Sequence, residues 1–231
     1  MTTTAEKIYQ VLYHMYGPCG WWPFMQKKGN DLTCVYHPGN YDFPKTRSQI
    51  YEIAIGAILT QNTAWRNVEK ALANLYNLGA FKIKNINKID DETLKAAIKP
   101  SGYYNQKAKK IRAFNDFFRQ LKGNVPSRDQ LLDIWGVGPE TADSILLYGY
   151  RAPSFVIDAY TRRIFISLGI IQEDMTYEEI KKWFENNLPS DVALFQEYHA
   201  LIVRHAIAYY QKKADYAQDP LLTSEFFDLI K

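Results

Sequence analysis

The stretch from Leu131 to Tyr148, LLDIWGVGPETADSILLY, has the residue types of a turn that can bind a phosphate. Two helical patterns flank a Gly-Val-Gly turn, and Pro139 begins the second helix at a position where its missing N–H costs nothing. Glycines let the backbone turn tightly, and the N–H groups and dipole of the new helix favour an anion. An ordinary glycine turn between two helices is the alternative. The residues expected to contact the phosphate are Gly136, Val137, Gly138 and Thr141.

Asp158 has the chemistry of a general base or of an electrostatic stabiliser. It follows the short segment 154–157 and precedes an expected helix, where a carboxylate caps the first turn and the helix dipole favours its charged form. Such a carboxylate can stabilise positive charge that develops on a substrate, and it can orient a water molecule for attack. Helix capping alone is the alternative.

Three tryptophans are candidates for a stacking pocket, namely Trp21, Trp22 and Trp65. The first two lie in the segment 17–46, which is rich in Gly, Pro and aromatic residues, as is typical of a surface loop that carries function. Indole rings stack on flat ligands and attract cationic ones. Large aromatic residues are nevertheless more often part of the core.

The elements that must position these residues are helices. Apolar residues recur at helical spacing, for example within residues 50–58, and no stretch is convincing as a strand. Ser127 with Gln130, and Thr176 with Glu179, fit capping boxes at two helix starts. The helices expected are 4–16, 47–61, 65–77, 90–98, 105–122, 128–134, 139–149, 159–169, 176–187, 191–211 and 221–230.

Composition sets limits on the class of protein. The 231 residues carry 28 basic and 25 acidic side chains, and this balance is only a weak indication of nucleic-acid binding. The sequence has no apolar run long enough for a membrane span and no signal peptide, so we expect a soluble cytoplasmic protein without a membrane partner. Two cysteines are too few for a disulfide framework or a thiolate cluster. Packing or surface roles, and no metal, are expected for His14, His37, His199 and His205.

The sequence resembles the endonuclease III superfamily of helix-hairpin-helix DNA glycosylases. The resemblance rests on LLDIWGVGPETADSILLYGYRAPSFVIDAYTRRIF, in which Asp158 follows the hairpin, and on AIGAILTQNTAWRNVEKAL and KPSGYYNQKAKKI upstream. It covers most of residues 45–170. The motifs WWP, LTQNT and PSGYYNQKAK are similar to those of the 3-methyladenine DNA glycosylase III type.

This resemblance implies an all-α fold of two helical lobes, with a helix-hairpin-helix motif and the active site in the cleft between them. It puts residues 45–155 in a six-helix barrel lobe that contains the hairpin, and residues 1–44 and 156–231 in a second helical lobe formed by both termini. The implied partner is double-stranded DNA that contains a damaged base. A monomer associated with the nucleoid is expected.

The resemblance also implies base excision. Breaking the bond between base and deoxyribose leaves positive charge on the sugar, which Asp158 would stabilise while it orients the attacking water. Superfamily members that also cut the strand carry a lysine in the second hairpin helix, whose amine forms a Schiff base with the sugar. Glu140 stands at that position. We therefore expect a monofunctional glycosylase, with Glu140 either in the base pocket or simply matched to the helix dipole.

A duplex hides the scissile bond, so the damaged nucleotide must be flipped into a pocket. The resemblance puts Trp21, Trp22 and Trp65 in that pocket, where indole faces favour a positively charged alkylated purine such as 3-methyladenine. An amide at the turn 61–62 is expected to fill the gap left in the duplex, and a helix C-cap is the alternative. The further residues expected to contact DNA are Gln61, Asn62, Arg66, Tyr104, Lys107 and Arg162.

The chain departs from many of these relatives near its carboxyl end. Four cysteines hold an iron–sulfur cluster in those relatives, whereas Tyr210, Tyr216 and Asp219 take three of the positions here. We expect no cluster, and a Tyr-rich tail that packs as a plain apolar substitute. Whether the hairpin holds a monovalent cation stays open.

Two other functions stay open. A glycosylase for an oxidised or mismatched base would keep the enzyme class, although an uncharged lesion usually needs more directional polar contacts than aromatic rings supply. A non-catalytic helix-hairpin-helix DNA-binding module would be indifferent to the charge of Asp158.

Overall fold

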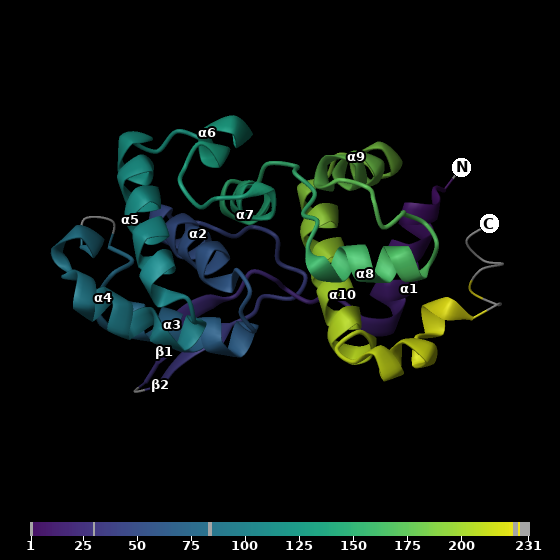
Figure 1. The fold of residues 1–231 in the computed structure, drawn as a ribbon, viewed down its shortest axis with the longest axis horizontal. Helices are drawn as coiled ribbons and strands as arrows, with labels where there is room; N and C mark the ends of the chain where they lie inside the picture. The colour runs from purple at the N-terminus through teal and green to yellow at the C-terminus, as the bar shows by residue number, and fades with distance from the viewer. Residues whose placement is uncertain (1, 30, 83–84, 224–225, 227–231) are drawn as a thin grey trace. The chain divides into compact units, whose positions relative to one another are not determined.

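The computed structural model describes residues 2–29, 31–82, 85–223 and 226. The chain divides into two compact units that are built mainly of helices (Figure 1). Unit 1 contains residues 1–21, 38–41 and 153–231, and unit 2 contains residues 22–37 and 42–152. The expected all-α class is confirmed, with one small β-hairpin added to it.

Unit 2 is organised around α2 (Arg47–Thr60), whose residues 51–59 are all buried. The other elements of this unit are β1 (Phe24–Lys28), β2 (Asp31–Val35), α3 (Trp65–Asn77), η1 (Ile86–Lys88), α4 (Asp91–Ile98), η2 (Lys99–Ser101), α5 (Tyr104–Gln120), α6 (Arg128–Leu132), α7 (Pro139–Ser144) and η3 (Ile145–Gly149). A helix without a polar face must be covered on all sides. α3, α5, α7 and η3 pack against α2 and provide that cover (Figure 1).

Unit 1 has an aromatic core between its helices. These elements are α1 (Thr4–Tyr16), α8 (Ala159–Ser167), α9 (Tyr177–Asn187), α10 (Val192–Tyr209), η4 (Lys213–Gln218) and η5 (Pro220–Leu222). Phe155 stacks on Phe184 with 4.2 Å between ring centroids, and Phe155, Phe184 and Tyr198 are all buried. The Tyr198 hydroxyl donates to the Ala5 carbonyl at 2.9 Å, so α10 is bonded to α1 through this core.

Local capping determines where several helices begin. The predicted capping boxes are confirmed at Ser127 with Gln130 and at Thr176 with Glu179. Further boxes of the same kind begin α1 and α2. Each box satisfies backbone N–H groups that the first helical turn leaves without partners. Because the residues of a box are close in the chain, these helix starts can be predicted from the sequence.

The β1–β2 hairpin was not expected, and the prediction of an irregular segment over residues 17–46 is wrong for this part. β1 pairs antiparallel with β2, with Phe24 opposite Val35 and Lys28 opposite Asp31. Only the first two residues of β1 are buried. The alternation of apolar and polar residues that marks a half-buried strand is therefore absent from β1, and β2 shows it over only a few residues.

The hairpin belongs to unit 2, whereas we expected all of residues 1–44 to belong to the lobe formed by the termini. The hairpin contacts α2 and α3. A Glu52 carboxylate oxygen accepts a hydrogen bond from the Met25 backbone N–H at 2.6 Å, and burial raises the pKa of Glu52 to about 7. This buried bond anchors the start of β1 on α2.

Two expected helices differ from the structure near their carboxyl ends. The helix expected over 139–149 changes to π-helical hydrogen bonding at Ile145, where η3 begins. The helix expected over 221–230 lies largely outside the described residues, and the described residues 220–222 form a 3-10 turn. The other helices follow the expected ranges to within a few residues at each end.

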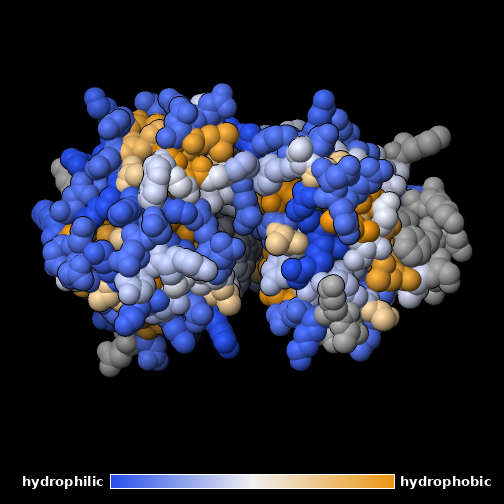
Figure 2. Space-filling view, viewed as in Figure 1, coloured by the Kyte–Doolittle hydropathy of each residue, from blue (hydrophilic) through white to orange (hydrophobic). Residues whose placement is uncertain are grey.

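The surface of the face shown in Figure 2 is mostly hydrophilic, with separate hydrophobic patches. No helix among the described residues combines the length and apolar character that a membrane span requires.

Candidate active site

Asp158 is the N-cap residue of α8, as the sequence predicts. Its Oδ1 atom accepts hydrogen bonds from the Thr161 backbone N–H at 2.7 Å and from the Thr161 hydroxyl at 2.8 Å. These bonds hold the carboxylate in one orientation at the start of a helix, where the dipole favours negative charge. The side chain is largely buried, with 14% of its surface exposed.

His199, on α10, is a second polar group beside this carboxylate. Its Nε2 atom lies 3.7 Å from Asp158 Oδ2. Burial has the largest single influence on Asp158 and raises its pKa, but the neighbouring His199 side chain and the bonds from Thr161 together lower the pKa below its usual value. Asp158 is therefore ionised at neutral pH.

We had expected an ordinary packing or surface role for His199. The residue lies on the buried side of α10, and α10 packs against α8. His199 is 41 residues after Asp158, and no sequence motif links the two positions. Their proximity follows only from the packing of α10 against α8.

Trp22 and Trp65 lie together in unit 2. Their ring centroids are 5.4 Å apart with the rings nearly perpendicular, and Trp22 also contacts the Tyr148 ring at 5.4 Å. Trp22 is buried, and Trp65 is partly exposed. A Cβ atom on Gly56 would be only 2.9 Å from Trp22 Cζ2, so the indole lies directly against the backbone of α2. Trp65 is thus the ring that can meet a ligand, and Trp22 supports it.

Trp21 belongs to unit 1, together with Asp158. Its side chain is partly exposed. Within unit 2 the structure brings together Trp22, Trp65 and Tyr148, and the sequence did not indicate Tyr148 as a partner of the tryptophans. The sequence feature that could have indicated Tyr148 is its position, as an aromatic residue, in the apolar helical segment that follows the Gly-Val-Gly turn.

Gln61 connects the end of α2 to the Gly-Val-Gly turn before α7, which is the hairpin of the helix-hairpin-helix motif. Its Nε2 atom donates to the Gly136 carbonyl at 3.1 Å and to the Thr141 hydroxyl at 2.9 Å, and its Oε1 atom accepts from Lys110 at 2.5 Å. Both ends of the amide are therefore engaged within unit 2. The predicted contact of Gln61 with DNA stays a prediction, and it would require these bonds to be exchanged. Asn62, the second amide of the turn, is exposed and has a left-handed backbone with φ of 52°.

The two hairpin glycines are required for different reasons. Gly136 has φ of 83°, and a Cβ atom there would lie 2.6 Å from the Lys110 side chain. Gly138 has an ordinary φ of −95° as the N-cap of α7, and a Cβ atom there would face open space. The positive φ and the nearby Lys110 side chain explain why residue 136 is a glycine. At Gly138 the missing side chain leaves space at the start of α7 that a ligand could occupy. Val137 is buried, so it offers only its backbone to a ligand.

Lys107 is buried, which corrects its predicted role as a DNA contact. Its Nζ atom donates to the Leu59 carbonyl, the Thr63 hydroxyl and the Ser101 carbonyl, each at 2.7 Å. Burial, and then the nearby charge of Lys110, lower the pKa of Lys107 to about 8. An ammonium with three internal acceptors has no N–H left for a phosphate. Thr141 is likewise buried, so its hydroxyl serves Gln61 rather than DNA.

The remaining predicted contact residues lie nearer the surface. Arg66 and Glu140 are exposed, and Glu140 lies in the first turn of α7. Tyr104 and Arg162 are partly exposed, and Arg162 donates to the Glu173 carbonyl at 3.0 Å. These positions are compatible with contact to a large ligand.

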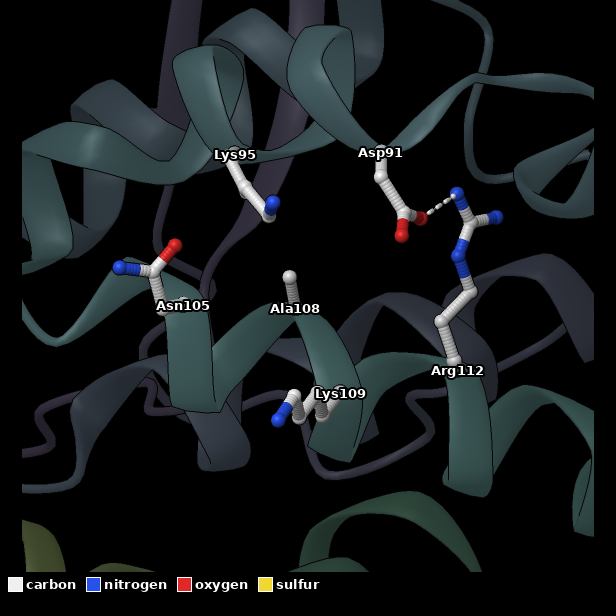
Figure 3. Close-up of a pocket in the computed structure, with 6 residues that line it drawn as sticks. All are labelled: Asp91, Lys95, Asn105, Ala108, Lys109 and Arg112. Atoms are coloured by element: carbon white, nitrogen blue, oxygen red, sulfur yellow. Dashed lines mark hydrogen bonds and ion pairs between the residues drawn. The ribbon is translucent and has the colours of Figure 1, made fainter.

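A pocket of about 300 Å³ lies between α4 and α5 (Figure 3). Its lining residues are Asp91, Lys95, Asn105, Ala108, Lys109 and Arg112. Arg112 is committed to structure, since it donates to the Ile86 and Ile89 carbonyls and pairs with Asp91 at 2.9 Å. None of the predicted base-pocket residues lines this pocket.

The carboxyl-terminal segment is joined to α10 by a buried polar network. Asp219 Oδ1 accepts from His205 Nε2 at 2.9 Å, and its Oδ2 accepts from the Tyr210 hydroxyl at 2.5 Å. His205 Nδ1 is also bonded to the Tyr16 hydroxyl at 2.9 Å, and Tyr210 contacts the Tyr216 ring at 4.5 Å. The expectation of a plain apolar substitute is therefore wrong, because a buried network of hydrogen-bonded polar side chains lies at the centre of this region.

The donor set of this segment does not fit an iron–sulfur cluster. The network of Tyr16, His205, Tyr210 and Asp219 includes no thiolate, and Cys19 and Cys34, the only cysteines of the sequence, both lie outside the segment. Among the residues that the structure describes, no group of three or more His, Cys, Asp or Glu side chains could hold a metal ion.

Comparison with known proteins shows the family of the chain. A family model for the HhH-GPD superfamily base excision DNA repair proteins matches residues 55–190. A protein of Methanocaldococcus jannaschii, provisionally named as a DNA repair glycosylase, is 42% identical over 90% of this chain and 89% of its own length. Endonuclease III of Sulfolobus acidocaldarius is 29% identical over 72% of this chain and 76% of its own length.

Solved structures show the same fold. H. pylori 3-methyladenine DNA glycosylase bound to 1,N6-ethenoadenine is similar with a TM-score of 0.67 and 29% identity, over 89% of this chain and 97% of that chain. A trapped endonuclease III–DNA covalent intermediate is similar in fold, with a TM-score of 0.73 and 18% identity over the whole of both chains. The chain therefore belongs to the HhH-GPD superfamily of base excision DNA repair proteins and is a DNA glycosylase of that family.

Proposed function

We propose that this DNA glycosylase releases an alkylated purine, such as 3-methyladenine, from duplex DNA by hydrolysis, and that it does not cut the strand. The observation that carries the proposal is the state of Asp158. This carboxylate is ionised, is held on one oxygen by Thr161, and stands after the hairpin where the superfamily has its catalytic aspartate.

The chemistry required of Asp158 is electrostatic. As the bond between base and sugar breaks, the deoxyribose gains positive charge, and a fixed carboxylate stabilises that charge without having to reorganise. Oδ1 is occupied by Thr161, so Oδ2 is the oxygen that can face the sugar or accept a hydrogen bond from the attacking water. An alkylated purine with positive charge is a good leaving group, so no strong general acid is needed.

The absence of strand cleavage follows from Glu140. A lyase reaction requires a neutral amine that attacks the sugar carbon and forms an imine, and a carboxylate cannot do this. Glu140 is exposed in the first turn of α7. Water therefore remains the nucleophile, and the product is an abasic site in an intact strand.

The substrate class is inferred from the aromatic residues. Trp65 is partly exposed and is braced by Trp22, which itself packs on Gly56 and Tyr148. An indole face attracts a cationic ring by about 1–2 kcal/mol when water is excluded, which favours an alkylated purine over a neutral base. The structural relative from H. pylori, named as a 3-methyladenine DNA glycosylase, supports the same class.

Contact with the duplex would come from two features of unit 2. The backbone N–H groups at the start of α7, next to the open space at Gly138, suit a DNA phosphate. Asn62 is exposed at the turn after α2 and carries an amide that can donate and accept, so it is the side chain that would fill the gap left by the flipped nucleotide.

The proposal is tested with duplexes that each carry one defined lesion. Free base and strand breaks are followed separately, with an alkylated purine, an oxidised purine and a mismatched thymine compared at equal concentration. We expect release of the alkylated purine and strand breaks only after alkali treatment. Borohydride is added during turnover, and a trapped protein–DNA adduct would show that a lysine is the nucleophile.

A further inference from the structure

Lys107 is the centre of a polar cluster that joins three separate segments of unit 2. Its ammonium donates to Leu59 at the end of α2, to Thr63 in the following turn, and to Ser101 at the end of η2. The side chain is 2% exposed. Burying a charge is costly unless its hydrogen bonds are satisfied, and here each of the three N–H groups has an acceptor at 2.7 Å.

The two turns are also bonded directly to each other. The Thr63 hydroxyl donates to the Ser101 carbonyl at 2.5 Å, so Thr63 and Ser101 share both this bond and the ammonium of Lys107. The Ser101 hydroxyl in turn donates to the Ile98 carbonyl at 2.7 Å, which attaches the cluster to the end of α4. The turns over residues 61–64 and 99–103 are therefore one rigid assembly.

Each turn carries an exposed side chain on a left-handed backbone. Asn62, next to Thr63, has φ of 52°. Tyr103, two residues after Ser101, has φ of 46° and is 70% exposed. A left-handed conformation at a residue other than glycine costs about 1–3 kcal/mol and persists only where the surroundings impose it. The cluster around Lys107 supplies that constraint for both residues.

We propose that Lys107 is a positioning residue that holds Asn62 and Tyr103 as a matched pair for insertion into the duplex at the lesion. This inference rests on the proposed function. An amide and an aromatic ring on neighbouring turns can occupy the gap in one strand and stack on a base of the other. A lysine ammonium carries three N–H donors on a single nitrogen atom. It can therefore bond at once to the three acceptors that three separate segments present.

The test uses Lys107→Met, which keeps the length of the side chain and removes its donors. Binding is measured by fluorescence anisotropy to a duplex with a tetrahydrofuran abasic-site analogue and to the undamaged duplex. We expect the preference for the abasic duplex to fall about tenfold, comparable with the loss of one side chain that stacks on a base. Lys109→Met, an exposed lysine on the same helix, is the control and should leave the preference unchanged.

A second protein background distinguishes a positioning role of Lys107 from a general effect on the stability of the fold. In the Asn62→Ala/Tyr103→Ala protein, Lys107→Met should have no further effect on the preference, because the pair that it positions has been removed. Fluorescence of 2-aminopurine placed opposite the abasic site reports insertion, and it should rise with the wild type and stay low with Lys107→Met. An unchanged preference in Lys107→Met, or an equal loss in both backgrounds, would overturn the proposal.

Thr63→Val provides the same test with a smaller change in folding, because it removes one acceptor and the bond to Ser101 while the ammonium remains. It should lower the preference and the 2-aminopurine signal in the same direction, and an unchanged signal would count against the proposal. Binding to the abasic analogue requires no base release. Failure of the proposed substrate class is therefore distinguishable from failure of the positioning role.

Discussion

Asp158 Oδ2 and His199 Nε2 lie 3.7 Å apart, on two helices that pack against each other in unit 1. The other carboxylate oxygen is held by Thr161. The Thr161 bonds are local to the helix start, whereas His199 is distant in the sequence. The Asp158 carboxylate is thus oriented by its own helix, and a residue of a second helix helps to lower its pKa.

Removing the charge of Asp158 should abolish base release. Asp158→Asn keeps an N-cap oxygen for Thr161, because Asn is also a good N-cap residue, but it removes the negative charge that stabilises the sugar. We expect the rate to fall about 10²-fold or more, with lesion binding largely retained. Single-turnover release of free base is the measurement. Asp191→Asn, at the N-cap of α10, is the matched control and should keep wild-type activity.

Removing His199 should shift the acid side of the pH–rate profile to higher pH. The pKa of Asp158 is lowered, so the active ionised form persists above that pKa and is lost as the pH falls through it. In His199→Leu, burial still raises the pKa of Asp158, but the contribution of His199 that lowers this pKa is lost. The pKa of Asp158 should therefore be higher than in the wild type. Single-turnover rates measured across acidic pH report the shift. A profile that coincides with that of the wild type would show that His199 does not act on Asp158.

Gly56→Ala should destabilise the fold although alanine favours helices. Alanine in a helix interior is better than glycine by about 1 kcal/mol, but here its Cβ would lie 2.9 Å from Trp22 Cζ2. Overpacking in a core costs about 1–3 kcal/mol, so we expect a net loss of stability in urea unfolding. Combining Gly56→Ala with Trp22→Leu should relieve the clash, and the two changes should therefore be non-additive.

Gly138→Ala should have the opposite pattern. Its φ of −95° suits alanine, and the added Cβ would meet no protein atom within 4 Å. Stability should change by less than about 0.5 kcal/mol, as for an ordinary surface substitution, whereas affinity for duplex DNA should fall because the methyl group occupies the approach of a phosphate. Parallel unfolding and DNA-binding measurements check this, and unchanged affinity would remove the hairpin from the DNA contact.

Asp219→Ala should strongly destabilise the protein. The side chain is fully buried and hydrogen-bonded to His205 and Tyr210, and each buried polar group left without its partner typically costs about 1–3 kcal/mol. Thermal unfolding followed by circular dichroism is the measurement. Asp174→Ala, at an exposed position of the same unit, should change the melting temperature little. A small loss in Asp219→Ala would mean that the network contributes little to holding the carboxyl-terminal segment.

Features that depend on near neighbours in the chain could be predicted from the sequence. Capping boxes such as that of Ser127 and Gln130, the N-cap role of Asp158, and the glycine turn after Ile134 are encoded within a few residues, because the first turn of a helix is satisfied locally. The same locality explains why nearly all the helix ranges were predictable from apolar spacing. The family was recognisable because these local motifs occur together.

Which polar side chains remain available to a ligand depends on how distant segments of the chain pack together. Lys107 and Gln61 have the residue types of DNA contacts, yet the first is enclosed by Leu59, Thr63 and Ser101 and the second bridges to the hairpin. His199 and Asp219 received their partners in the same way. A buried polar group takes whichever partner the packing of distant segments brings to it, and that information is not carried by its neighbours in the chain.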